Sequence, residues 1–224
     1  ALQELLPEAI ISCYDSYDDS QLSHLLDWAD VVCIGCGLGM GQISEKILKN
    51  VLKNVSCPCV IDADGLNLLS RNIELLNQCC APVILTPHMK EMSRLTGWSI
   101  DTIMEDRFQA LDQIIKQSGP DTKSSIICVL KDSRTVVAQT NRQRFVNLAG
   151  NNSMAKGGSG DVLAGTIAGL LAQHMAPFEA TTVGVFLHAC GGDEAKKSKG
   201  SYSVLARDLI QGMADAMKNA KECR

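Results

Sequence analysis

The chain has 224 residues, 46% of them hydrophobic, with a formal net charge of −4 and an isoelectric point near 5.6. This length and apolar content suffice for one sizeable core, so we expect a single domain over residues 1–224. The lack of a long basic run argues against a nucleic-acid surface, and no apolar stretch reaches the roughly 18 residues of a membrane span. The first residues, ALQELLPEAI, do not resemble a signal peptide, and we expect a cytoplasmic protein. They also lack a methionine, which indicates a chain that was trimmed or that starts within a domain.

The cysteine count is high, yet it does not indicate a disulfide scaffold, because such scaffolds are normally short and rich in loops. We expect reduced, mostly buried thiols that act as small hydrophobic groups. A zinc site formed by the first two pairs is the alternative, although each pair straddles a predicted strand whose alternate residues face opposite sides. The ten cysteines are Cys33 and Cys36, Cys57 and Cys59, Cys79 and Cys80, and the single Cys13, Cys128, Cys190 and Cys223.

Hydrophobic periodicity predicts strands that alternate with helices along the first half of the chain. Amphipathic patterns predict helices over 41–54 and 101–119 and two long helices over 177–198 and 203–221. In 101–119, apolar residues recur at spacings of four, three and four, and Gly119 with Pro120 is expected to end the helix. The predicted strands are residues 31–35, 58–63, 82–86, 125–131, 135–140 and 144–149.

This alternation predicts an α/β fold with a mainly parallel sheet flanked by helices. The strands within 125–149 follow one another without helices and are therefore expected to be antiparallel neighbours at one edge. In such folds ligands bind at the carboxyl ends of the strands. Polar or glycine-rich segments follow five of the predicted strands, so we expect them to converge on one rim. These segments are GCGLGMG (35–41), DADGL (62–66), TPHMKEM (86–92), KDSRT (131–135) and the stretch that starts at residue 150.

The glycine-rich stretch GNNSMAKGGSGDVLAG, residues 150–165, carries the strongest chemical signal. Free N–H groups at a helix N-terminus form an anion site, and Asp161 there could deprotonate a hydroxyl that attacks a phosphate. The stretch is not a Walker A loop, because Lys156 precedes the glycines. The alternative is that Asp161 only caps the helix. GCGLGMG alone is ambiguous, since its glycines could serve a ligand or only a tight turn.

Four motifs in order, GCGLGM, DADGLNLL, LTPHMKEMSRLTG and NSMAKGGSGDVLAGTIAGLLAQ, resemble the ADP/ATP-dependent NAD(P)H-hydrate dehydratases of the ribokinase-like superfamily. The resemblance covers nearly the whole chain. It implies a ribokinase-like three-layer sandwich with a mainly parallel sheet. Members of the family usually carry a further N-terminal segment before the motif PEA, including a first strand.

The resemblance also implies a repair reaction on the (S)-hydrate of NADH or NADPH. The family phosphorylates the ring hydroxyl from ADP or ATP and then eliminates phosphate, which restores NAD(P)H and releases AMP when ADP is the donor. It implies Mg²⁺ as the phosphate counter-ion, a homotetramer, and no nucleic-acid or membrane partner.

The family pattern assigns the site by position. Asp161 matches the catalytic base, and Asp132 stands where glycine is commoner, which leaves the preference for ADP or ATP open. Cys36, Lys90 and Ser153 also depart from the usual residues, and no dedicated protein metal ligand is predicted. The positions that match substrate binding are Gly39, His88, Asn152 and Asp161, and those that match nucleotide binding are Lys131, Asp132, Ser133, Arg134, Thr135, Gly157, Gly158 and Gly160.

Two other functions remain open on the sequence. One is a small-molecule kinase of the same superfamily that acts on a vitamin-type alcohol, and the other is a nucleotide-binding module without activity. The motifs TPHxxEM and DADGL favour the dehydratase. His24 and His174 are expected at the surface or at helix ends, and His188, in an apolar helix, is expected in the core.

Overall fold

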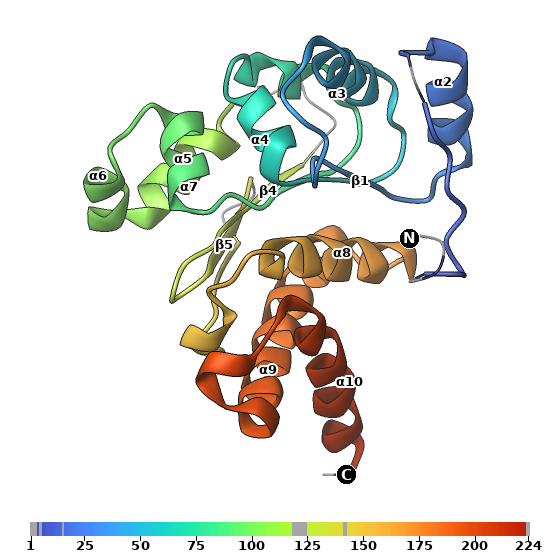
Figure 1. Ribbon diagram of the computed structural model, residues 1–224. Helices are drawn as coiled ribbons and strands as arrows, with labels where there is room; N and C mark the ends of the chain where they lie inside the picture. The colour runs from blue at the N-terminus through green and yellow to red at the C-terminus, as the bar shows by residue number, and fades with distance from the viewer. Residues whose placement is uncertain (1–3, 5, 15, 118–124, 141–142, 223–224) are drawn as a thin grey trace.

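The structure, a computed structural model, describes residues 4, 6–14, 16–117, 125–140 and 143–222. Within these residues six strands form one sheet in the order β1-β2-β3-β4-β5-β6 (Figure 1). The first four are parallel, and β5 and β6 join them as antiparallel neighbours, as predicted. The strands are β1 (Val32–Ile34), β2 (Cys59–Ile61), β3 (Val83–Leu85), β4 (Ile126–Leu130), β5 (Val136–Gln139) and β6 (Arg144–Val146).

Helices cover both faces of the sheet and make three layers (Figure 1). One face carries α2 (Asp19–Trp28), α3 (Gln42–Asn54), α4 (Ala63–Leu69), η1 (Ile73–Gln78), α5 (Met89–Thr96), α6 (Ile100–Glu105) and α7 (Arg107–Ile115). On the other side lie η2 (Asn152–Met154), α8 (Ser159–Ala172), α9 (Pro177–Ser203) and α10 (Ala206–Glu222), with α10 packed on α9.

The two layers of core follow from the period of two in a strand. Ile61 and Leu85 pack against the α2–α7 layer. Val60, Ile84 and Ile127 pack against α8 and α9. Because both faces of the central strands are covered, these strands read as continuous apolar runs.

The predicted helix over 101–119 is wrong as one continuous element. Asp106 has extended backbone angles (φ −144°, ψ 90°) and separates α6 from α7, and its carboxylate accepts the N–H of Gln109 at 2.9 Å. An aspartate that caps a new helix competes with helix continuation. The predicted stop at Gly119 and Pro120 lies outside the described residues. The strand predicted over 144–149 ends at Val146.

The expectation of mostly buried cysteines is also wrong, although all nine described cysteines are free thiols. Only Cys59, Cys79 and Cys128 are buried, and Cys33 is exposed because β1 is an edge strand. Cys33 pairs in register with Val60, so Cys33 and Cys59 point to opposite faces of the sheet. This geometry rules out the four-cysteine zinc site. None of the helices in the described part of the chain is long and apolar enough to cross a membrane.

Candidate active site

The centre of the candidate site is an ion pair between the ends of two strands. Asp62 follows β2 directly and Lys131 follows β4 directly, and Lys131 Nζ lies 2.7 Å from Asp62 Oδ1. Asp62 is only 2% exposed. β3 lies between these two strands, and Pro87 belongs to the loop that follows it. The backbone N–H of Lys131 donates to Pro87 O at 2.8 Å, which joins this loop to the same edge of the sheet. The strand-end loops therefore meet as predicted.

The loop after β1 is fixed against the same aspartate segment. Gly35 has φ +122°, and a Cβ at this position would lie 1.9 Å from the carbonyl oxygen of Asp62. Only glycine fits here, which supports a tight turn as one role of the GCGLGMG loop. Farther along, the Gly39 N–H donates to Asp64 Oδ2 at 2.8 Å, so this loop is held by the first turn of α4.

The glycine-rich stretch places the N-terminus of α8 over the Asp62–Lys131 pair. Gly158 caps the helix in the left-handed conformation (φ +85°) without any side-chain cap hydrogen bond. A Cβ on Gly160 would lie 3.1 Å from Lys131 Nζ and 3.4 Å from Asp62 Oδ2. Glycine here lets the helix terminus approach the pair closely. The N–H groups of this first turn have the positive partial charge that attracts anions.

Asp161 is the third residue of α8 and is exposed. One atom each from Cys36 (Sγ), Asp62 and Asp161 (carboxylate oxygens) lie within 4.8 Å of one another. A hydrogen bond with Cys33, together with the nearby Asp161 carboxylate, raises the pKa of the Cys36 thiol, so this group stays protonated next to Asp161. Since Gly158 caps the helix, the interpretation of Asp161 as only a helix cap does not fit the structure.

His88 lies at the same rim as the N-cap of α5. Its Nδ1 accepts the N–H groups of Lys90 and Glu91 at 3.1 and 3.2 Å, and the Glu91 carboxylate accepts the N–H of His88 at 2.8 Å. This is a capping box with histidine in the place that serine or threonine usually takes. Burial raises the pKa of Glu91. The His88 side chain remains 48% exposed, and its Nε2 lies 3.4 Å from Glu91 Oε1.

The side chains of the predicted nucleotide-binding segment, residues 131–135 after β4, make contacts in different places. Lys131 points into the cluster, whereas Asp132 forms a 2.8 Å ion pair with Arg107 of α7. Arg134 donates to the Leu148 carbonyl at 3.4 Å, and Thr135 Oγ1 donates to the Asp132 carbonyl at 3.2 Å. Ser133 is exposed. The Asp132 carboxylate, predicted to approach the nucleotide, is therefore paired with an arginine.

Besides Asp132, Ser133, Arg134 and Thr135, two more predicted residues are not brought into the cluster by any described contact. Asn152 is exposed at the start of η2, and Gly157 is exposed in the turn before α8. The neighbouring Asn151 makes the contacts in this loop: its Nδ2 donates to Asp193 of α9 at 2.7 Å.

Asp62 is a site residue that sequence reasoning missed, although the motif that contains it was marked. The available signal was a carboxylate placed directly after an apolar strand of a parallel sheet. Asp62 also bears on the choice of metal. Two carboxylates close together supply the oxygen ligands that Mg²⁺ prefers, so the donor set fits the ion that the family pattern implies.

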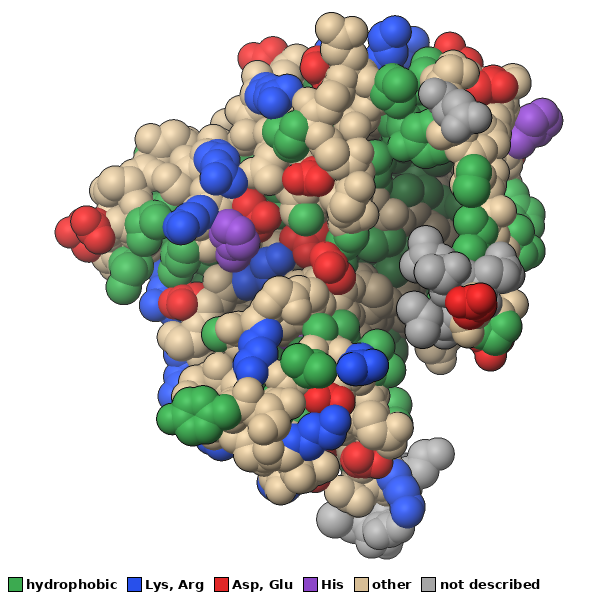
Figure 2. Space-filling model, in the orientation of Figure 1, with side chains coloured by type: hydrophobic (Ala, Val, Ile, Leu, Met, Phe, Trp, Pro, Cys, Tyr) green, Lys and Arg blue, Asp and Glu red, His purple; other side chains and the backbone are tan. Residues whose placement is uncertain are grey.

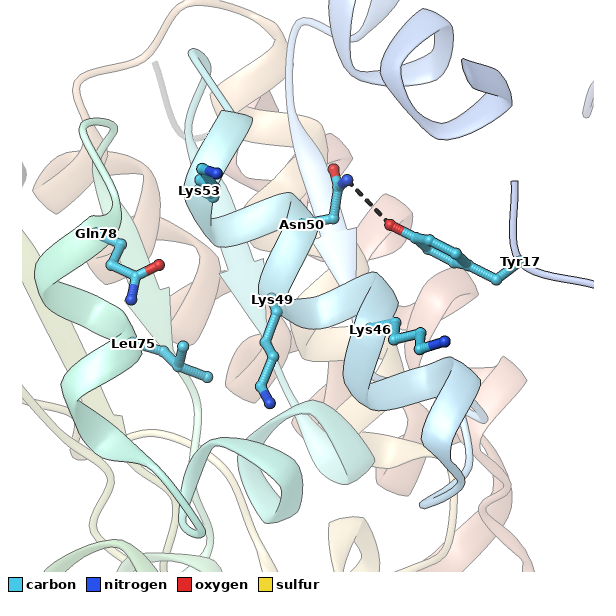
Figure 3. A pocket seen from close by; sticks show the side chains of 7 residues that line it. All are labelled: Tyr17, Lys46, Lys49, Asn50, Lys53, Leu75 and Gln78. Carbon is cyan, nitrogen blue, oxygen red and sulfur yellow. Dashed lines mark hydrogen bonds between the residues drawn. The ribbon is translucent and has the colours of Figure 1, made fainter. Parts of the chain in front are cut away.

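On the molecular surface, acidic, basic and histidine side chains gather between the α4–α5 region and the α8 region (Figure 2). A separate cavity of about 420 Å³ lies along α3, and Leu75 and Gln78 of η1 form another part of its lining. Lys46, Lys49 and Lys53 line the cavity from α3 (Figure 3). Asn50 Nδ2 donates a hydrogen bond to the Tyr17 hydroxyl at the edge of the cavity. None of the predicted site residues lines this cavity, so the cluster at the strand ends remains the candidate active site.

Solved structures with the same fold include kinases of the ribokinase-like class. A hydroxyethylthiazole kinase from Pyrococcus horikoshii aligns with a TM-score of 0.68 at 16% identity, over 88% of this chain and 76% of that one, which shows a shared fold. The model of the NAD(P)H-hydrate dehydratase family matches residues 1–214, and the chain belongs to this family.

Named relatives agree with the family match. The chain is 35% identical to the ADP-dependent (S)-NAD(P)H-hydrate dehydratase of Neisseria meningitidis, over 97% of this chain and 73% of the relative. It is 37% identical to the bifunctional NAD(P)H-hydrate repair enzyme Nnr of Moorella thermoacetica, over 86% of this chain but only 35% of that protein. The chain thus spans about a third of the bifunctional relatives. The ADP/ATP-dependent NAD(P)H-hydrate dehydratase of Bacillus subtilis, co-crystallised with ATP/Mg²⁺ and soaked with CoA, aligns with a TM-score of 0.74 at 26% identity, over 97% of this chain and 76% of that one.

Proposed function

We propose that the chain dehydrates the (S)-hydrate of NADH or NADPH at the expense of ADP or ATP, with Asp161 as the base. The observation that carries the proposal is the position of Asp161 at the free N-terminus of α8, beside the Asp62–Lys131 pair. The dehydratase relatives support the choice of substrate. The site offers a base, a cation and backbone N–H donors, which are the groups that phosphoryl transfer to a hydroxyl requires.

The proposed chemistry has two steps. The ring hydroxyl of the hydrate attacks the terminal phosphorus of the nucleotide, Asp161 accepts its proton, and AMP leaves from ADP or ADP leaves from ATP. General-base assistance of this kind contributes about 10²–10⁴ in rate. The phosphate then departs with the electrons of its C–O bond while a neighbouring ring carbon loses a proton to solvent water, and the electrons of that C–H bond restore the ring double bond.

Phosphate oxygens in this proposal bind the N–H groups of the α8 N-terminus, including Gly160, and the Lys131 ammonium. Mg²⁺ would be held by the Asp62 carboxylate together with the phosphates, and it would neutralise charge on the transferred group. Asp62 keeps one oxygen on Lys131, and its second oxygen faces Gly160 and makes no hydrogen bond among the described contacts, which suits this role. Asp161 then retains its carboxylate for the proton.

The remaining residues are proposed to bind the two substrates from opposite sides of this centre. Gly39, His88 and Asn152 would contact the hydrated nicotinamide half, and the exposure of about half of the His88 side chain supports this role. The nucleotide would lie against residues 131–135 and the glycines of 157–160. The ion pair of Asp132 with Arg107 favours this placement, because it reduces repulsion between the carboxylate and a polyphosphate.

We also propose that residues 1–224 form a single domain of a cytoplasmic homotetramer. Membership of all described strands in one sheet supports the single domain. Free thiols at all nine described cysteines suit a reducing compartment. Large apolar side chains exposed on α9 and α10 support assembly between copies of the chain. They are Val183, Phe186, Ile210 and Met217.

To test this proposal, the protein is incubated with hydrated NADH, Mg²⁺ and either ADP or ATP. The near-ultraviolet absorbance of the dihydronicotinamide and the release of phosphate are followed over time. We expect the absorbance to recover as phosphate appears. A stable phosphorylated product without recovered absorbance would instead indicate a small-molecule kinase. Nucleotide binding without turnover would indicate a binding module.

A further inference from the structure

The loop 150–159, which presents the N-terminus of α8, is tied at its first end to α9. Asp193 Oδ2 accepts the backbone N–H of Gly150 at 3.0 Å, and Asp193 Oδ1 accepts Nδ2 of Asn151 at 2.7 Å. Both oxygens of one carboxylate are therefore used by two consecutive residues of the loop. Hydrogen bonds to an ionised acceptor are stronger than neutral ones, so this contact fixes the start of the loop firmly.

The middle of the loop continues this contact with α9. Asn151 Oδ1 accepts the backbone N–H of Ser153 at 3.0 Å, and Ser153 is 2% exposed. A Cβ added to Gly192 of α9 would lie 2.3 Å from Met154 Sδ, so the helix and η2 are packed without space for a larger residue. The loop thus rests on one side of α9.

The second end of the loop is tied to α9 by His188. His188 Nε2 lies 3.3 Å from the hydroxyl oxygen of Ser159, and both residues are 8% exposed. Ser159 is the first residue of α8 and precedes Asp161 by two positions. Burial lowers the pKa of His188 to about 4, with a smaller contribution from the Lys131 ammonium, so the ring is neutral near pH 7. A neutral ring can hold the serine hydroxyl without adding charge to the anion site.

We propose that Asp193 and His188 are positioning residues that clamp the two ends of the loop 150–159 on α9 and thereby place Asp161 and the α8 N–H groups. The role in turnover rests on the proposed function, whereas the clamp itself does not. Neither residue reaches the reacting atoms in this proposal. Each acts through a loop residue, Asp193 through Asn151 and His188 through Ser159.

The expected effect falls on kcat more than on KM, because the clamp sets the geometry of the reacting groups. A displacement of about 1 Å at such groups can cost about 10²-fold in rate. We expect Asp193→Ala and His188→Leu each to lower kcat by about tenfold or more, with the KM for nucleotide changed by less than about threefold. His188→Gln, whose amide can still reach Ser159, should recover most of the loss.

Matched controls separate the clamp from a general change of charge or of histidine content. Glu194 is next to Asp193, and its carboxylate pairs only with Lys197 in the described contacts, so Glu194→Gln removes the same charge without touching the loop. His174 is exposed after α8 with φ +61°, a conformation that asparagine tolerates, so His174→Asn controls for the loss of an imidazole. Both controls should turn over like the unaltered protein.

A second measurement does not depend on activity. Hydrogen exchange followed by mass spectrometry should show faster exchange in peptides from 150–159 of Asp193→Ala and His188→Leu, with unchanged exchange in β2–β4. If Asp193→Ala does not fold, Asp193→Asn replaces it, because asparagine keeps one acceptor oxygen. We then expect a smaller rise in the exchange rate of the loop and a smaller loss of kcat. Unchanged exchange in the loop, or a kcat within about twofold of the controls, would overturn the clamp. If the unaltered protein has no dehydratase activity, the proposed function fails while the exchange result still decides the clamp.

Discussion

The Lys131 ammonium lies 2.7 Å from the Asp62 carboxylate, although the two residues are 69 positions apart in the sequence. The contact joins the ends of β2 and β4 across the intervening β3. Asp62 is nearly fully buried, and the Lys131 side chain is 18% exposed. An ion pair in such a place holds both groups in fixed positions, and it makes the loss of either partner costly.

Removing only the lysine should therefore destabilise the protein. Lys131→Met leaves the Asp62 carboxylate buried without its cation, and we expect a loss of about 3 kcal/mol in the free energy of unfolding. The double variant Asp62→Asn with Lys131→Met should be more stable than Lys131→Met alone, because no unpaired charge remains. Urea unfolding of the four members of this double-mutant cycle measures the coupling. Additive effects would show that the pair is not coupled.

The Asp161 carboxylate should control turnover and not nucleotide binding. Asp161→Asn keeps the size of the side chain but cannot accept a proton, so we expect turnover to fall by about 10²–10⁴. It also removes a negative charge next to the phosphates, so the affinity for ADP should hold or increase. Steady-state kinetics and calorimetric titration with ADP measure both quantities. Thermal melting of the variant serves as the control, and near-normal turnover in a folded variant would remove Asp161 from the mechanism.

Much of the fold could be predicted from the sequence because the relevant signals are local. Predicted strands of five to seven residues correspond to all six observed strands, and the helix-free interval after residue 125 predicted the antiparallel edge. The break at Asp106 was missed because the apolar spacing continues across it. A local signal was present, since Asp106 and Gln109 have the spacing of a capping box.

The site was only partly predictable because its contacts depend on how distant segments meet. The strand-end rule located the loops, and the motifs selected Asp161 and Lys131. No sequence pattern specified that Cys36 lies beside Asp161, or that Asp132 pairs with Arg107 from a different helix. These contacts depend on side-chain directions that residue spacing does not fix.

His88 should have two separable functions, one in stability and one in substrate use. His88→Ala removes the N-cap of α5 and should cost about 1 kcal/mol of stability. His88→Asn retains a capping acceptor but lacks the partly exposed ring. We therefore expect His88→Asn to be nearly as stable as the unaltered protein and yet to have a raised KM for the hydrate, with nucleotide affinity unchanged. An equal loss of affinity for both substrates in His88→Asn would count against a role at the nicotinamide side.

The Arg107–Asp132 ion pair should protect nucleotide binding from the Asp132 carboxylate. In Arg107→Ala the Asp132 charge is no longer paired, so we expect the affinity for ADP to fall by a few-fold, roughly in line with up to about 1 kcal/mol for a partly exposed pair. The effect should shrink as ionic strength rises. Asp132→Gly in the same background should restore the affinity. Failure of that second substitution to restore ADP binding would show that Arg107 acts in another way.

Burial of His188 should make stability depend on pH in a defined window. Its pKa is lowered from 6.5 to about 4 in the folded protein, so below about pH 6.5 the unfolded chain binds a proton that the folded chain excludes. The free energy of unfolding should therefore fall as the pH is lowered from about 6.5 to about 4, by up to about 3 kcal/mol from this group. His188→Gln lacks the titration and should show a flatter dependence over the same window, while Glu91, whose pKa is raised, contributes equally to both proteins. Urea unfolding of the two proteins at several values between about pH 7 and pH 4.5 gives the difference directly, and parallel curves would show that His188 titrates normally in the folded state.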